Sequence, residues 1–179
     1  VDVIVSLNAS PFQIDKQNQR IDICKLFALK FDLSFIYVNM VGGQDEVVFD
    51  GNSFVISNLG ELTLQLPAFK ELSSLHNSAD YLPSTLSEEE SIYSALVLAT
   101  KDYIQKNSFG GALIGLSGGI DSALTLAVAA DAIGPENVHA VMMPYQFTSD
   151  MSLEDSELQA RNQGVQFSNI DIHSMVDSF

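Results

Sequence analysis

An apolar strand, a glycine loop and the start of a helix follow one another in the stretch Ala112-Leu113-Ile114-Gly115-Leu116-Ser117-Gly118-Gly119-Ile120-Asp121-Ser122. Gly118 and Gly119 allow a backbone turn in which a Cβ would clash, so successive N–H groups and the helix N-terminus converge on an anion. Ser117 and Ser122 add small hydroxyl donors. The stretch therefore predicts a phosphate-binding loop between a buried strand and a helix.

The elements that follow this loop alternate between helix and strand. We expect a helix at about 121–133, a strand at 138–143, a helix at about 152–163 and a strand at 165–172. This alternation predicts a doubly wound α/β fold with a parallel sheet and right-handed crossovers. A ligand of such a sheet binds at the carboxyl ends of the strands, where the glycine loop lies.

The first 71 residues predict another α/β region, which ends in an antiparallel meander. We expect a strand at 1–7, a helix at about 15–31, and strands at 35–41, 46–49, 53–57 and 62–66. Ile21, Cys24, Ala28 and Phe31 recur at spacings of three and four, so they share one face of the helix. Turn residues at 58–61 separate the last two strands and favour antiparallel pairing.

A linker is predicted between the two regions. Residues 72–87 contain Ser, Asn, His, Asp and Pro without hydrophobic periodicity. Ser87 and Glu90 then form a capping box, in which each side chain accepts a hydrogen bond from the backbone N–H of the other residue. A helix is therefore expected to begin at 88, with an apolar stripe formed by Ile92, Leu96, Ala99 and Tyr103.

Composition excludes several classes of function. With 23 acidic and 8 basic residues, the 179-residue chain has a net charge of −15, which opposes binding to nucleic acid or to an anionic membrane surface. No apolar run approaches the roughly 18 to 20 residues of a membrane span, and the start lacks the basic region of a signal peptide. The single Cys24 permits no internal disulfide. We expect a soluble cytoplasmic protein without nucleic-acid or membrane partners.

The glycine loop differs from two common nucleotide-binding motifs. It has no lysine, so it is not a Walker A loop, and its glycine spacing is not that of the dinucleotide fingerprint. Residues Ser117 to Ser122 instead resemble the SGGxDS signature of the ATP pyrophosphatases, which cleave ATP to AMP and pyrophosphate. ATP is therefore the expected nucleotide.

Further segments extend this resemblance over nearly all of the chain. The second half is similar to the synthetase domain of NAD synthetases in the segments 116–122, 140–144 and 147–149, with Ser152 and Asp155 beyond them. The first half resembles the late part of a nitrilase-type glutaminase domain in Asn8-Ala9-Ser10-Pro11-Phe12 with Lys16 and Arg20, and in the segments 37–46 and 49–51. Glutaminase followed by synthetase is the order of the glutamine-dependent NAD synthetase family.

This resemblance implies the fold class and the domain boundaries. Residues 1–71 would form the end of a nitrilase-like α-β-β-α sandwich, residues 72–87 the linker, and residues 88–179 the beginning of an adenine nucleotide alpha hydrolase-like domain with a doubly wound parallel sheet. Both domains would be incomplete. The implied reaction activates deamido-NAD with ATP as an acyl-adenylate, which ammonia from glutamine converts to NAD with release of AMP, pyrophosphate and glutamate.

The resemblance also implies roles for individual residues. Asp121 matches the family's Mg²⁺ ligand, although an Asp at this place is also a common helix N-cap. Ser10 and Lys16 match positions that contact glutamine, and a lysine at a helix start is otherwise usually solvated. The implied ATP-binding residues are Gly115, Leu116, Ser117, Gly118, Gly119, Ile120, Asp121 and Ser122. Thr148 and Ser149 are expected to cap the next helix.

Several features indicate a piece of a longer protein. The chain begins in a strand without an initiator Met and stops at Phe179, after only part of the expected sheet. The glutaminase triad of Glu, Lys and Cys lies earlier in the family's order than the Asn8 segment, and none of it is present. Cys24 is interpreted as a core residue because it lies on an apolar helical face. We expect no glutamine hydrolysis by this chain alone.

The remaining polar residues are interpreted as structural. The histidines at 76, 139 and 173 have no spacing that would gather a metal site. Turns at Gly42-Gly43 and Gly51 explain the nearby carboxylates of residues 45, 46 and 50. Two alternatives stay open: another ATP pyrophosphatase amidotransferase, such as a GMP or asparagine synthetase, and a noncatalytic adenine-nucleotide binding module. A homo-oligomer is expected.

Overall fold

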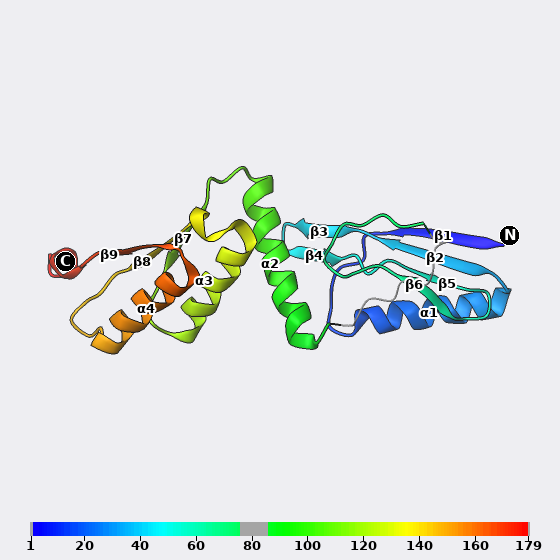
Figure 1. The fold of residues 1–179 in the computed structure, drawn as a ribbon, viewed down its shortest axis with the longest axis horizontal. Helices are drawn as coiled ribbons and strands as arrows, with labels where there is room; N and C mark the ends of the chain where they lie inside the picture. Colours follow the sequence, from blue (N-terminus) through cyan, green and yellow to red (C-terminus); the bar gives the residue numbers. More distant parts are fainter. Residues whose placement is uncertain (1, 76–85, 179) are drawn as a thin grey trace. The chain divides into compact units, whose positions relative to one another are not determined.

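A computed structural model describes residues 2–75 and 86–178, and the chain divides into two compact units, Val1–Ala99 and Thr100–Phe179 (Figure 1). Residues 76–85, which make up most of the predicted linker and include His76, lie outside the described residues. The predicted boundaries at 71 and 88 therefore stay predictions.

A four-stranded sheet forms the centre of the first unit. Its strands are β1 (Val3–Asn8), β2 (Ser34–Asn39), β5 (Phe54–Ile56) and β6 (Leu62–Gln65), in the order β1-β2-β5-β6. Helix α1 (Lys16–Phe31) connects β1 to β2, which run parallel, whereas β2, β5 and β6 pair antiparallel as the meander predicted. The core between helix and sheet contains Ile21, Cys24, Ala28, Phe54 and Ile56.

The buried face of α1 differs from the prediction at its end. Ile21, Cys24 and Ala28 are buried, but Phe31 is 52% exposed. Arg20 takes the place of an apolar residue on this face and is only 5% exposed. Because Arg20, Cys24 and Ala28 follow one another at a spacing of four, they line up along the helix. Phe31 instead stacks on Phe27, with ring centroids 5.9 Å apart.

A hairpin of β3 (Val41–Gln44) and β4 (Val47–Asp50) replaces the predicted turn at Gly42-Gly43. That prediction was wrong, since both glycines lie inside β3 and are buried. The turn falls on Asp45, which has φ 52°, and Gln44 pairs with Val47 across it. A two-residue hairpin loop requires positive φ, which Asp tolerates better than most residues. The glycine pair was therefore the weaker turn signal.

Helix α2 (Glu88–Lys106) begins with the predicted capping box. Ser87 N–H donates to Glu90 Oε2 at 2.7 Å, and Glu90 N–H donates to Ser87 Oγ at 3.1 Å. The predicted apolar stripe is not buried, because Leu96 is 44% exposed and Tyr103 57% exposed, while Ala95 is buried. Apolar spacing identifies a face that favours burial, but it does not supply the surface that covers it.

The second unit contains the predicted parallel sheet. Its strands β7 (Ala112–Gly115), β8 (Val138–Met142) and β9 (Gln166–Asn169) pair in that order with parallel register. Helix α3 (Ile120–Ile133) joins β7 to the short helix η1 (Pro135–Asn137), which precedes β8, and α4 (Asp150–Gln163) joins β8 to β9. The core residues come from α3, α4 and β8 and from the positions just after β7 and just before β9: Leu116, Leu126, Ala129, Ala130, Val138, Ala140, Ala160 and Val165.

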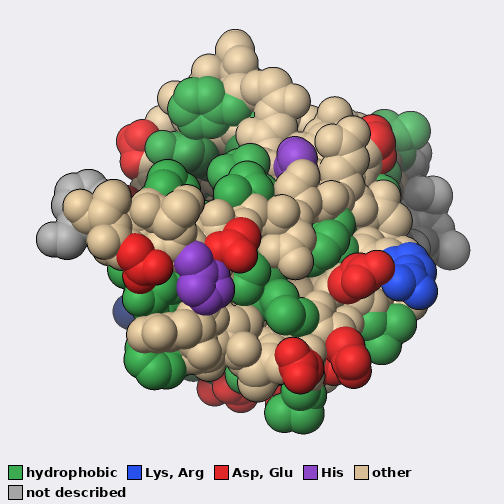
Figure 2. All heavy atoms as spheres, turned by 90° about the vertical axis from the view of Figure 1, so that its left-hand side faces the viewer, with side chains coloured by type: hydrophobic (Ala, Val, Ile, Leu, Met, Phe, Trp, Pro, Cys, Tyr) green, Lys and Arg blue, Asp and Glu red, His purple; other side chains and the backbone are tan. Residues whose placement is uncertain are grey.

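Two boundaries in this unit differ from the prediction. Helix α4 begins at Asp150 rather than near 152, because Ser149 caps it. Strand β9 ends at Asn169 rather than at 172, and a short helix α5 (His173–Val176) follows it. Among residues 2–75 and 86–178, no helix is long and apolar enough to cross a membrane. Acidic side chains dominate the charged groups on the face shown in Figure 2, in keeping with the net charge of −15.

Candidate functional site

The glycine loop runs from the end of β7 into α3, at the carboxyl edge of the parallel sheet. Leu116, the first residue after β7, anchors the loop. Its side chain is 3% exposed, and its N–H donates to Val141 O at 2.9 Å. Ser117, Gly119 and Asp121 are exposed beyond this anchor. The sequence therefore places the loop where a ligand of a parallel sheet is expected to bind.

The two loop serines hold each other. Their hydroxyl oxygens lie 2.9 Å apart, and Ser122 Oγ donates to Gly119 O at 2.9 Å. A serine has one hydroxyl hydrogen, so Ser117 Oγ must be the donor between the two hydroxyls. Backbone N–H groups of Ser117 and Gly119 donate to Ser122 Oγ and Ser117 Oγ at 3.2 and 3.3 Å. Both hydroxyl hydrogens are thus used inside the loop.

The two loop glycines meet different requirements. Gly118 has φ 77°, and a Cβ there would lie 2.7 Å from the backbone of Ser152 on α4. Gly119 has φ −90° and is the N-cap of α3, where a Cβ would meet only Ser117 Oγ at 3.4 Å. Packing and backbone conformation therefore require glycine at position 118. At Gly119, the space that a Cβ would occupy is open to a ligand.

Asp121 is the second residue of α3 and its side chain is exposed. The alternative that Asp121 caps the helix is wrong, since Gly119 occupies the N-cap position without a side-chain hydrogen bond. The first N–H groups of a helix have no intrahelical partner, so the first turn of α3 offers these donors to an anion. Donors and a carboxylate thus lie on the same helix end.

A cavity of about 480 Å³ adjoins the loop. It is formed at the carboxyl ends of β7 and β8 and the start of α4, by Gly115, Leu116, Ser117, Met142, Met143, Phe147, Thr148, Ser149 and Ser152. The capping prediction for Ser149 is confirmed, because Ser149 Oγ accepts from Ser152 N–H at 3.1 Å. Thr148 Oγ1 instead accepts from Tyr145 N–H at 3.0 Å. Both residues therefore combine a structural hydrogen bond with a place in the cavity wall.

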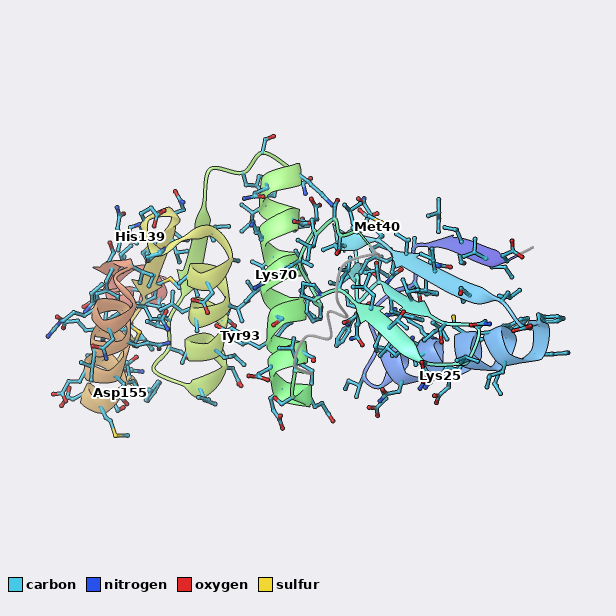
Figure 3. All side chains as sticks on the ribbon, turned by 45° about the vertical axis from the view of Figure 1, so that its right-hand side comes forward. Lys25, Met40, Lys70, Tyr93, His139 and Asp155 are labelled. Atoms are coloured by element: carbon cyan, nitrogen blue, oxygen red, sulfur yellow. The ribbon has the colours of Figure 1, made fainter. Side chains whose placement is uncertain are left out.

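The residues around Asp121 fit Mg²⁺ held together with phosphates. No group of three or more His, Cys, Asp or Glu side chains that could hold a metal ion occurs in the described part of the chain. Mg²⁺ in nucleotide sites uses one or two carboxylates, several waters and substrate phosphates, so one exposed carboxylate beside free N–H groups suits it. Asp155, another carboxylate within the NAD synthetase resemblance, lies on the exposed side of α4 (Figure 3).

A second candidate site lies in the first unit, on the loop between β1 and α1. Ser10 N–H donates to Asn39 Oδ1 at 2.8 Å, and Asn39 Nδ2 donates to Ser10 O at 3.1 Å. Lys16 is the first residue of α1 and is half-buried. Two hydrogen bonds therefore tie the Ser10 backbone to the end of β2, and Lys16 follows at the start of the helix.

Sequence reasoning missed the group that supports this loop. Arg20 and Asp50 form an ion pair at 2.9 Å whose side chains are 4% and 3% exposed. Asn52 Nδ2 donates to Asp50 Oδ2 at 3.0 Å, so Asp50 belongs to a buried network rather than to a surface turn. A signal was present, because Arg20 lies four residues before Cys24 on the apolar face of the predicted helix. A cation in such a stripe indicates a buried acidic partner.

Cys24 is a buried core residue, as predicted. Burial raises the pKa of the Cys24 thiol to about 11, so the thiol is protonated at neutral pH and a poor nucleophile. His139 Nε2 shares a hydrogen bond of 2.8 Å with Ser168 Oγ across β8 and β9. The His173 backbone and ring nitrogens hydrogen-bond to Asp171, which lowers the pKa of that carboxyl. Neither histidine adjoins the glycine loop in sequence.

Comparisons with known proteins match both halves of the chain. A family model described as NAD synthase matches residues 92–179. The glutamine-dependent NAD(+) synthetase of Acinetobacter baylyi is 45% identical over 100% of this chain, which corresponds to 35% of that protein. That of Synechocystis sp. is 37% identical over 100% of this chain and 34% of its own length.

Solved structures agree with these matches. The structure of the glutamine-dependent NAD+ synthetase from Acinetobacter baumannii in complex with ADP superposes with a TM-score of 0.93 at 46% identity, covering 100% of this chain and 36% of that one. The enzyme from Cytophaga hutchinsonii shares the fold at 18% identity, with a TM-score of 0.84, 99% of this chain and 39% of that one. The chain thus belongs to the glutamine-dependent NAD(+) synthetase family and spans about a third of the length of the relatives that it matches.

Proposed function

We propose that this chain is part of a glutamine-dependent NAD synthetase. The enzyme would activate deamido-NAD with ATP as an acyl-adenylate, and ammonia from glutamine would displace AMP to give NAD, with pyrophosphate and glutamate as the other products. The observation that carries the proposal is the glycine loop, which presents the first-turn N–H groups of α3, without partners inside the helix, at the edge of a parallel sheet. Similarity over both halves supports the glutamine-fed form of the reaction.

In this proposal the loop from Gly115 to Ser122 binds the phosphates of ATP. Negative charge gathers on the leaving pyrophosphate, so fixed N–H dipoles stabilise the transition state more than they stabilise bound ATP. The donors come from the backbone, because the hydroxyl hydrogens of Ser117 and Ser122 are already used. Asp121 would hold Mg²⁺, which when bound neutralises charge on the phosphates.

The first half would contribute to glutamine binding. Ser10 and Lys16 would contact glutamine, since a hydroxyl and an ammonium suit its oxygens. The Glu, Lys and Cys of the glutaminase triad would come from a part of the enzyme beyond this chain, and buried Cys24 is unsuited to the role. We therefore expect the chain by itself to be inactive towards glutamine.

The proposal extends to the organisation of the enzyme. We infer a glutaminase part at 1–71, a linker at 72–87 and a synthetase part at 88–179, because the capping box starts a new helix at 88 and the NAD synthase match begins within that helix. The nitrilase-like and adenine nucleotide alpha hydrolase-like assignments, the homo-oligomeric state and a cytoplasmic location belong to the same proposal.

Exchange of labelled pyrophosphate into ATP tests the proposed function. We expect the full-length protein to catalyse this exchange only with deamido-NAD and Mg²⁺ present, because formation of the acyl-adenylate is reversible. ATP binding without exchange would contradict the proposal and favour a noncatalytic nucleotide-binding module. Exchange that depends on XMP or aspartate instead of deamido-NAD would favour another ATP pyrophosphatase.

A further inference from the structure

We infer that Arg20 and Asp50 orient the Ser10 hydroxyl as a hydrogen-bond donor towards an oxygen atom of glutamine, which makes both residues positioning residues of the glutamine site. This inference rests on the proposed function, because it assigns a substrate to Ser10. It starts from a buried ion pair at the loop between β1 and α1, which the synthetase reaction does not use.

The Arg20 guanidinium is shared between its partner and the loop. Nη1 donates to both carboxylate oxygens of Asp50 at 2.9 Å. Nε and Nη2 donate to Ser10 Oγ at 3.2 and 3.1 Å, and Nη2 also reaches the backbone oxygens of Ser10 and Pro11 at 2.8 and 3.0 Å. Asp50 thus fixes the guanidinium, and the guanidinium fixes the loop.

These contacts leave the Ser10 hydroxyl with one function. A serine hydroxyl has two acceptor lone pairs and one hydrogen, and an arginine has no acceptor. Since two N–H groups of Arg20 occupy the acceptor side of Ser10 Oγ, only its hydrogen remains for another partner. Within residues 2–75 and 86–178, the hydroxyl takes part only in these two hydrogen bonds.

This polarity selects the chemistry of the ligand. A hydroxyl that offers its hydrogen binds a carboxylate or amide oxygen and does not bind an ammonium group. The buried cation strengthens the effect, because donation to Ser10 Oγ polarises the O–H bond. Ser10 is half-buried, so the hydroxyl is accessible from one side. The Ser10 hydroxyl therefore donates to an oxygen of glutamine, and Arg20 acts on glutamine only through Ser10.

The Arg20→Lys variant of the full-length enzyme tests the positioning role of Arg20. It keeps a cation beside Asp50 but lacks the forked donors that reach Ser10 Oγ. We expect KM for glutamine to rise about five- to tenfold, which is the loss of roughly one hydrogen bond. The kcat at saturating glutamine stays within about twofold. Ammonia-driven NAD synthesis serves as the internal reference, and Lys30→Met, which removes another α1 cation, is the matched control.

A second variant guards against loss of fold. Arg20→Met combined with Asp50→Leu removes both buried charges together, which proteins tolerate better than the loss of one. We expect the melting temperature to stay close to that of the wild type while KM for glutamine rises. Ser10→Ala should raise KM in the wild type but add little in this background, because Arg20 acts through Ser10.

Two results would overturn the inference. If either Arg20 variant is folded and keeps the wild-type KM for glutamine, Arg20 does not position Ser10. If Ser10→Ala has its full effect in the double variant, the two residues act independently. Failure of the proposed function is distinguishable, because the wild type would then make no NAD from deamido-NAD with either ammonia or glutamine, and the inference would fail with it.

Discussion

The loop at Ser10 and the glycine loop at Ser117 use serine hydroxyls in opposite ways. In the glycine loop, the Ser117 hydroxyl donates to Ser122 Oγ and the Ser122 hydroxyl donates to Gly119 O. The donors for a ligand are therefore backbone N–H groups at the start of α3. In the Ser10 loop, a buried arginine fills the acceptor side of the hydroxyl, and no acceptor in the described part of the chain takes its hydrogen. Two loops that each contain serine therefore present different donors, depending on whether a buried charge lies beside the hydroxyl.

If the glycine loop binds ATP and the Ser10 loop binds glutamine, a substitution in the glycine loop should lower NAD synthesis from both nitrogen sources. We expect Asp121→Asn to lower ammonia-driven and glutamine-driven synthesis alike, by about 100-fold or more, because one carboxylate oxygen contact to Mg²⁺ is lost where charge develops. Initial rates measured across a Mg²⁺ titration test this. Glu154→Gln, on the exposed side of α4, is the control. Mg²⁺-dependent activity near the wild-type level would contradict the metal assignment.

Substitutions of Gly118 and Gly119 should distinguish the effect of loop packing on stability from the effect of ligand access on ATP binding. Gly118→Ala places a Cβ 2.7 Å from Ser152 at a positive φ, so we expect a loss of about 2 kcal/mol in the free energy of unfolding together with weaker ATP binding. Gly119→Ala has no comparable clash and should lower stability only by about 0.5 to 1 kcal/mol through the N-cap position, yet weaken ATP binding about tenfold. Denaturation and ATP titration of both variants give the comparison. Equal stability of the two would contradict it.

The serine pair should have a smaller effect. Ser122→Ala removes the acceptor of Ser117 and the donor to Gly119 O, so the loop loses order but no direct phosphate contact. We expect KM for ATP to rise about three- to fivefold, with kcat little changed. Steady-state kinetics with ammonia as the nitrogen source measure both constants. A large fall in kcat would instead indicate that the hydroxyl contacts the transition state.

Cys24 should affect stability at high pH and leave activity unchanged. Its folded pKa of about 11 lies above the unfolded value near 9.0, so the folded state keeps a proton that the unfolded state loses. Stability is therefore full below about pH 9 and falls as the pH rises towards 11, by about 1 kcal/mol per pH unit. Denaturation of wild type and Cys24→Ala between pH 8 and 10.5 isolates this effect from other titrating groups. Parallel pH curves for the two proteins would contradict it.

Much of the fold could be predicted from the sequence, because local signals and tertiary packing agree there. The alternation after Ala112 gave the parallel sheet, and Ser87 with Glu90 gave the start of α2. Errors arose where packing between elements overrides local preference. Gly42 and Gly43 have the composition of a turn, yet both are buried inside a strand, and Phe31 extends an apolar pattern beyond the end of the packed face.

The candidate sites were predictable in part. The loop from Gly115 to Ser122 is continuous in sequence, so its motif could be recognised directly. The support of Ser10 could not be found in this way, because Asn39, Arg20 and Asp50 come from three elements that only the fold brings together. The internal use of the Ser117 and Ser122 hydrogens likewise depends on distances that spacing does not reveal.

The buried pair of Arg20 and Asp50 also limits how this part of the chain can evolve. Losing either residue alone leaves an unpaired charge in the interior, at a cost of about 3 to 5 kcal/mol, whereas replacing both at once can be nearly neutral. Single steps away from the pair would therefore be removed by selection. Among descendants of this sequence, positions 20 and 50 should stay as they are or change together, and a lineage that lost both would need a new way to hold the residue at position 10.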